Sequence, residues 1–119
     1  MPRTVRYKSR MDLMQGTLDL IILQTLRRGA QHGYGISQAI NAASREAFKA
    51  ETGTLYPALH RLEERGWIAS EWKTSDNKQR ANYYKLTAAG RKRLASEQSR
   101  WLQLVEAMAS LMSVRDHEA

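Results

Sequence analysis

Residues 53–64 place small, hydroxyl and basic side chains on one side of a predicted helix and leucines on the other. At about 100° per residue, Leu55, Leu59 and Leu62 form an apolar stripe. The opposite side collects Gly53, Thr54, Pro57, His60, Arg61 and Glu64. Backbone amides and threonine hydroxyls at a helix start suit phosphate oxygens, and arginine is the side chain that most often contacts guanine. The pattern indicates a helix that binds nucleic acid with its polar side.

Two threonines compete as the N-cap of this helix. Pro57 costs least near a helix start, where its missing N–H would have no helical partner in any case. This favours Thr54 as the N-cap, whereas a start at Thr52 requires one backbone hydrogen bond to be lost. Both assignments stay open at this stage.

The residues that metal sites and covalent catalysis require are absent or scattered. The chain has no cysteine, and its three histidines, His32, His60 and His117, show neither i,i+4 nor HExxH spacing. Neither a GxGxxG nor a GxxxxGK[ST] phosphate-binding loop is present. We therefore predict no enzymatic activity, no metal site and no cofactor.

Positive charge is concentrated in the first part of this 119-residue chain, whose length is that of one domain. Residues 1–95 carry a net charge of +9 and residues 96–119 a net charge of −2. Residues 1–11 hold four basic side chains without an apolar period, so we predict a flexible arm. The arm either contacts phosphates or a minor groove, or only aids solubility.

Because the longest aliphatic run covers only residues 20–23, we predict no membrane span and a cytoplasmic location.

A helical core and a hairpin must position these side chains. Apolar periodicity predicts helices over 14–28, 36–43, 53–65 and 88–113 and strands over 67–73 and 81–86. We expect a tight connector over 30–35 before the second helix, Gly66 to end the third helix and Thr87 to cap the last. The predicted fold class is mainly α with a small β-hairpin, in the element order of a winged helix-turn-helix domain. We assign this domain to residues 12–90 and a C-terminal dimerisation helix and tail to 91–119.

The last predicted helix carries more apolar surface than so small a domain can cover. Leu94, Trp101, Val105, Met108 and Met112 recur at steps of seven, four, three and four, which is the spacing of an interhelical seam. We therefore predict a homodimer. The alternative is a helix that folds back on its own domain, and the two arrangements are not exclusive.

Four motifs follow one another along residues 12–95. They are QGTLDLIIL at 15–23, HGYGI at 32–36, TGTLYPAL followed by RLE at 52–63, and YYKLTAAG at 83–90. In this order they resemble the PadR family of bacterial transcriptional regulators, in its subgroup with a short C-terminal helix. The resemblance implies a dimeric winged-helix repressor of a pseudo-palindromic operator. Its third helix would enter the major groove, its wing would contact the DNA backbone, and its last helix would pack near the partner's first helix.

The predicted site residues follow from the helix pattern, the basic hairpin and this resemblance. Predicted DNA contacts are Tyr34, Ser37, Gln38, Thr52, Gly53, Thr54, Tyr56, Pro57, His60, Arg61, Lys73, Lys78 and Arg80. The predicted dimer interface comprises Leu18, Ile22, Leu94, Trp101, Leu104, Val105, Met108 and Met112. Some members of the family bind small aromatic or drug-like effectors at that interface, and Trp101 is the candidate residue here, with a core position as its alternative.

Three alternatives accompany these predictions. Tyr34 and Tyr56 could instead be core rings whose hydroxyls reach a partner. The basic hairpin turn could be a solvated loop without a partner. A winged helix also serves as a protein-interaction or RNA-binding module, and these are the alternative functions.

Overall fold

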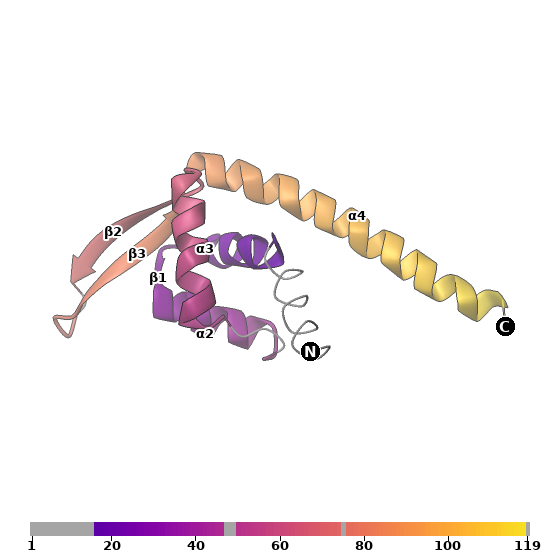
Figure 1. Ribbon diagram of the computed structural model, residues 1–119, viewed down its shortest axis with the longest axis horizontal. Helices are drawn as coiled ribbons and strands as arrows, with labels where there is room; N and C mark the ends of the chain where they lie inside the picture. The colour runs from indigo at the N-terminus through magenta and orange to yellow at the C-terminus, as the bar shows by residue number, and fades with distance from the viewer. Residues whose placement is uncertain (1–15, 47–49, 75, 119) are drawn as a thin grey trace, which may run out of the picture.

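The computed structural model describes residues 16–46, 50–74 and 76–118, so the predicted basic arm over 1–11 lies outside the described residues. A helix over residues 16–26 comes first. The elements that follow are β1 (Gln31–His32), α2 (Gly33–Ala43), α3 (Thr52–Glu64), β2 (Ile68–Thr74), β3 (Arg80–Leu86) and α4 (Ala88–Glu118). Figure 1 shows the shorter elements gathered at one end of the molecule while α4 runs away from them. The predicted fold class, a mainly helical winged helix-turn-helix domain with a long C-terminal helix, is confirmed.

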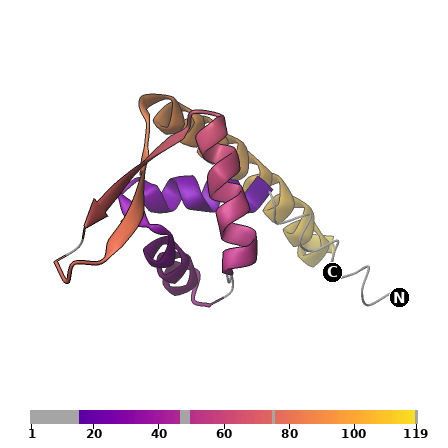
Figure 2. The ribbon, with the colours of Figure 1, turned by 60° about the vertical axis from the view of Figure 1, so that its left-hand side comes forward.

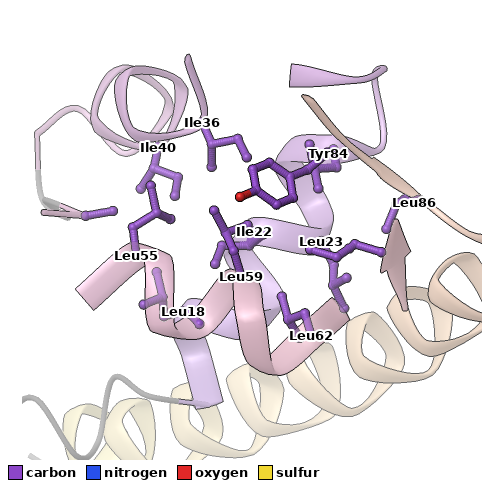
Figure 3. Packing of buried hydrophobic residues seen from close by; sticks show 14 of the residues in the cluster. Leu18, Ile22, Leu23, Ile36, Ile40, Leu55, Leu59, Leu62, Tyr84 and Leu86 are labelled. Atoms are coloured by element: carbon purple, nitrogen blue, oxygen red, sulfur yellow. The ribbon is translucent and has the colours of Figure 1, made fainter. Parts of the chain in front are cut away.

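One hydrophobic core joins the helices to the sheet. Figure 3 shows buried side chains meeting from different elements, among them Ile22 of the first helix, Ile36 of α2 and Leu86 of β3. The predicted leucine stripe of α3 points into this core, since its three side chains are at most 1% exposed. Because the stripe faces inward, the polar side of α3 faces solvent.

The hairpin belongs to a three-stranded antiparallel sheet in the order β1-β3-β2. Strands β2 and β3 pair from Ile68 opposite Leu86 to Thr74 opposite Arg80. The short strand β1 pairs with Tyr84 and Tyr83 of β3 and was not predicted, because two residues are too few to show an alternating pattern. Two strands alone are marginally stable, so β1 supplies support for the hairpin directly before α2.

Helix α2 begins at Gly33, so the connector predicted over 30–35 is partly helical. The imidazole Nδ1 of His32 accepts a hydrogen bond of 2.9 Å from the backbone N–H of Gly35 and caps the helix. Histidine is not one of the usual N-cap residues, which is why the sequence pattern placed the start too late.

The turn between α3 and β2 also holds the start of α4. Gly66 has a φ of +77°, in the left-handed region that ends helices, as predicted. The predicted cap by Thr87 is confirmed, since its Oγ1 accepts from the backbone N–H of Gly90 at 3.0 Å. The Thr87 hydroxyl donates to the Gly66 carbonyl at 2.6 Å, and the Thr87 N–H donates to the Trp67 carbonyl at 3.1 Å. These bonds fix α4 to the end of α3.

Helix α4 extends beyond the domain. It has 31 residues, which at about 1.5 Å per residue gives a length of roughly 46 Å. The radius of gyration is 17.0 Å, against roughly 13.5 Å for a compact chain of this length. Figures 1 and 2 show the C-terminal half of α4 away from the other elements, and residues 101–113 are exposed. Within one chain, the alternative of a last helix folded back on its own domain is therefore wrong for this half.

Among the described residues, no helix combines the length and apolar character that crossing a membrane requires.

Candidate nucleic-acid interface

The exposed side of α3 is the centre of the candidate interface. Thr52, Gly53, Tyr56, Pro57 and His60 are all exposed along it. Small side chains occupy the first turn, so the helix start can approach a flat or grooved ligand closely. Backbone amides at such a start favour phosphate oxygens.

The start of α3 differs from both predicted caps. The helix begins at Thr52 with Glu51 as N-cap, and no side chain caps it. Backbone N–H groups of Thr54 and Leu55 instead donate to the Glu51 carbonyl, at 2.9 and 2.7 Å. Pro57 therefore lies in the second turn, where it cannot donate the helical bond to the Gly53 carbonyl. The prediction assumed that proline would avoid this loss.

Arg61 does not lie on the exposed side of α3, and its predicted role as a reader of bases is not supported by its position. Its guanidinium Nη2 forms an ion pair with Asp19 Oδ1 of the first helix at 2.5 Å. Arg61 stands at the edge of the polar side of α3, and a long side chain at this edge can turn toward the first helix or toward solvent. The presence of a carboxylate on the first helix decides its direction.

The two tyrosines that could have been core rings are surface residues. Tyr34 is 68% exposed and Tyr56 is 44% exposed, so the core alternative is wrong. The Tyr34 hydroxyl accepts a hydrogen bond of 3.1 Å from Gln38 Nε2, one turn along α2. The Ser37 hydroxyl donates to the Ala50 carbonyl at 2.8 Å, so Ser37 holds the segment that leads into α3. These residues bring the start of α2 and the exposed side of α3 into one surface.

Aromatic rings hold the basic side chains of the hairpin. The Arg80 guanidinium carbon lies 5.1 Å from the centroid of the Trp72 ring, and Lys73 Nζ lies 5.7 Å from that of Tyr83. Since Trp72 and Lys73 are adjacent in a strand, the two pairs occupy opposite faces of the hairpin. Cation–π contacts of this kind restrict long basic side chains. Lys78 lies in the turn with a φ of +63°.

An open groove of about 730 Å³ separates this hairpin from the starts of α2 and α3. Tyr34, Tyr56, Trp72 and Arg80 line it, and Tyr84 and Asn82 contribute from β3. Burial, the neighbouring Tyr56 and the Glu63 carboxylate raise the pKa of the Tyr84 phenol, while a hydrogen bond with the Asn82 side chain lowers it. Tyr84 is therefore neutral at physiological pH. The groove presents uncharged hydrogen-bonding groups and rings beside a basic rim.

Sequence reasoning did not assign Trp72 and Tyr83 to this surface. Trp72 lies on the same sheet face as the buried Ile68. The hairpin extends past the helices that cover Ile68, and Trp72 is 59% exposed. The signal in the sequence was a basic residue on the other side of the turn from each ring, Arg80 for Trp72 and Lys73 for Tyr83.

The residues predicted for a dimer interface separate into two groups. Leu18, Ile22 and Leu94 are buried in the core of the single chain, so they offer no surface to a partner, and their assignment is corrected. Trp101, Leu104, Val105, Met108 and Met112 are exposed along α4. Periodicity alone could not separate the groups, because Leu94 near the start of α4 packs into the core while residues 101–113 are exposed.

A second, apolar groove of about 620 Å³ lies beside the exposed part of α4. Leu20 and Ile21 of the first helix, Ile40 of α2, and Trp101 and Leu102 of α4 line it. The side-chain amide of Gln98 donates to Gln24 Oε1 at 2.6 Å and links α4 to the first helix at this point. The groove continues the apolar side of α4 onto the domain.

Comparison with known proteins identifies the family. Residues 22–96 match the model of the Transcriptional regulator PadR-like family. The chain belongs to this family. It is thus a PadR-like transcriptional regulator with a winged-helix fold, and DNA is the partner that this membership implies.

Similar proteins come from several organisms. The chain is 34% identical over 86 residues to the transcriptional regulator Rv3488 of Mycobacterium tuberculosis, which covers 72% of this chain and 77% of that protein. A transcriptional regulator from Clostridium thermocellum superposes with a TM-score of 0.75 at 32% identity, covering 83% of this chain and 96% of the other. A PadR family transcription regulator from Clostridium difficile R20291 gives a TM-score of 0.69 at 29% identity, covering 80% and 97%.

Proposed function

We propose that this PadR-like regulator is a dimeric, sequence-specific repressor that reads an operator with α3 and binds the DNA backbone with its hairpin. The observation that carries the proposal is the shared exposure of the α3 polar side and the basic hairpin at one end of the molecule. A B-DNA major groove is wide enough to admit one α-helix, and the small residues of the first turn allow close approach.

The groups proposed to read the bases lie on or beside the exposed side of α3. Thr52, Tyr56 and His60 present hydroxyl and imidazole groups there, and Thr54 is half-buried at the edge. His60 Nε2 lies 3.4 Å from Glu64 Oε2, which leaves the imidazole on the surface with one neighbouring carboxylate. Hydroxyl and imidazole groups of this kind suit base edges, while the contacts of lysine and arginine with phosphate are assigned to the hairpin.

The hairpin supplies the backbone contacts. Lys73, Lys78 and Arg80 surround its turn, where only Asp76 opposes their charge. Each phosphate that a lysine or arginine neutralises releases counterions, so binding should weaken steeply as salt rises. A solvated loop without a partner would show no such effect when these residues are replaced.

We propose that a second copy of the chain covers the apolar side of α4. The exposed apolar side chains Trp101, Leu102, Leu104, Val105, Met108, Leu111 and Met112 are too many for a stable monomer surface. The apolar groove beside Trp101 continues this surface onto the domain, and part of the partner's α4 would occupy it. A dimer would present two α3 helices to two half-sites of a palindromic operator.

The same groove also suits a small aromatic or drug-like effector at Trp101. Its volume of about 620 Å³ is that of ordinary ligand sites, and its lining is mostly apolar. Titration with anilinonaphthalene sulfonate tests this directly. Saturable enhancement that Trp101→Ala abolishes would support a ligand site, whereas equal enhancement in both proteins would contradict it.

The DNA part is tested by mobility shift on duplexes from the region upstream of the gene. Thr54→Ala, His60→Ala and Arg80→Ala should each weaken specific binding. The matched control is Lys92→Ala, which removes one positive charge from the side of α4 opposite Trp101. Equal affinity of all four variants would contradict the assigned surface. Binding of RNA without preference for duplex DNA, or no nucleic-acid binding at all, would favour the RNA-binding or protein-interaction alternatives.

The dimer is tested by light scattering. Val105→Asp combined with Met108→Asp should halve the measured mass, because two carboxylates would enter the apolar contact. Ser99→Asp combined with Ser110→Asp adds the same charges to the opposite side of α4 and should leave the mass unchanged. The repressor role is tested in cells, where loss of the chain should raise transcription from the bound promoter.

A further inference from the structure

One ion pair joins the first helix to α3. Arg61 Nη2 lies 2.5 Å from Asp19 Oδ1, with the two residues 42 positions apart in the chain. Their side chains are 27% and 18% exposed, so the pair is largely withdrawn from solvent. The other ion pairs of the described residues each lie within a single helix, namely α3 or α4. This pair is therefore the one described ionic link between two helices.

The Arg61–Asp19 pair lies beside core residues and can add a directional contact to the apolar packing of α3. Asp19 is the only charged residue in the helical segment 16–26, and its neighbours Leu18 and Ile22 are core residues. The apolar contacts of the leucine stripe are non-directional. A charge-assisted hydrogen bond has a preferred length and angle, and it adds what the apolar contacts lack.

We infer that Arg61 is a positioning residue, which sets the orientation of α3 through Asp19 and does not contact DNA itself. The inference rests on the proposed function, since it concerns the helix that would read the operator. With Arg61 turned toward the first helix, the exposed residues of α3 up to Glu64 include no lysine or arginine. Affinity would then depend on Asp19, a residue of the wrong charge to touch a phosphate.

Asp19→Asn gives a test in which the two roles predict opposite signs. If Arg61 contacted DNA, removing the competing carboxylate would free the guanidinium and strengthen binding. If the pair positions α3, the same substitution should weaken specific binding, on the order of tenfold, as Arg61→Ala does. Because both variants break one contact, the double variant should be no weaker than either single variant.

The salt dependence supplies a second readout. Log affinity falls as log salt concentration rises, and removing one residue that contacts a phosphate reduces the magnitude of this slope by about 0.9. We expect the slope of Arg61→Ala to equal that of the unaltered chain, with Lys73→Ala as the control that lowers it. A reduced slope for Arg61→Ala would overturn the inference.

Backbone amide spectra of the free protein separate positioning from loss of folding. Asp19→Asn is nearly isosteric, so we expect a folded protein whose amide signals shift at Gly53, Tyr56 and His60 on α3. If Arg61→Ala unfolds, Arg61→Lys serves in its place and should retain charge but lose part of the affinity. Should the unaltered chain not bind duplex DNA, the proposed function fails. Should it bind while Asp19→Asn binds equally or more tightly, only the positioning role fails.

Discussion

A single methyl group added at Gly90 should displace the first turn of α4 and lower the stability of the protein. A Cβ added at this position would lie 1.9 Å from the Trp67 carbonyl oxygen and 2.9 Å from its carbonyl carbon. Carbon and oxygen that share even a weak hydrogen bond remain about 3.3 Å apart. The first turn of α4 must therefore move by more than about 1 Å, because the obstructing atom belongs to the backbone.

The free-energy change follows from three effects. Overpacking of this size costs about 1–3 kcal/mol, and losing the bond from the Thr87 N–H to the Trp67 carbonyl costs about 0.5–1.5 kcal/mol. Alanine in place of glycine in a helix returns about 0.5–1 kcal/mol. We expect Gly90→Ala to lower the free energy of unfolding by about 1–3 kcal/mol.

Urea unfolding followed by circular dichroism measures this change, at one protein concentration because association contributes to stability. Gly53→Ala is the matched control, since no atom lies within 4 Å of its added Cβ and the residue is also helical. The control should raise the unfolding free energy by up to about 1 kcal/mol. Equal or greater stability of Gly90→Ala would refute the packing of α4 on the turn after α3.

Three further predictions concern the sheet and its turn. Burial raises the pKa of Tyr84 above its usual value, so the folded state holds the phenol proton more tightly than the unfolded state does. This contribution to the unfolding free energy is therefore complete below about pH 10 and is lost as the pH rises further. Urea midpoints should be lower at pH 10.5 than at pH 9, and the difference should be smaller in Tyr84→Phe. Lys78→Gly should raise the unfolding free energy by up to about 1 kcal/mol, because glycine adopts the left-handed backbone conformation of this position without steric strain. The slope of log DNA affinity against log salt should decrease in magnitude by about 0.9, and an unchanged slope would mean that Lys78 does not contact DNA. Trp72→Ala should weaken DNA binding roughly two- to fivefold, because the ring that orients Arg80 is lost, and Trp72→Phe should retain most of the affinity; mobility shift compares them, and equal loss in both would show that the ring does more than orient Arg80.

The local sequence carried enough information for most elements of the fold. The leucine stripe of α3, the Gly66 stop and the Thr87 cap each depend on residues close together in the chain, and each is confirmed. Strand β1 and the early start of α2 depend on pairing with β3 and on a histidine cap. Those contacts join distant segments or use an uncommon cap, so no local sequence pattern predicts them.

The candidate site was less predictable for a similar reason. Helical spacing placed Arg61 at the edge of the polar side, but only the contact with Asp19, 42 residues earlier, decides where its guanidinium points. Spacing likewise grouped Leu94 with Trp101, although the first belongs to the core and the second is exposed. The hydrogen bonds around Thr87 and Gly90 fix where α4 begins on the domain. This starting point determines which turns of α4 pack against the domain.

Footprinting of the full chain on the duplex upstream of its own gene tests the central claim most directly. A dimer that inserts two α3 helices should protect two half-sites whose centres lie about one helical turn, 10–10.5 base pairs, or a multiple of it apart. The protection should disappear with Val105→Asp and Met108→Asp combined. Protection of a single half-site that persists in this variant, or no protection of duplex DNA at any salt concentration, would contradict the account.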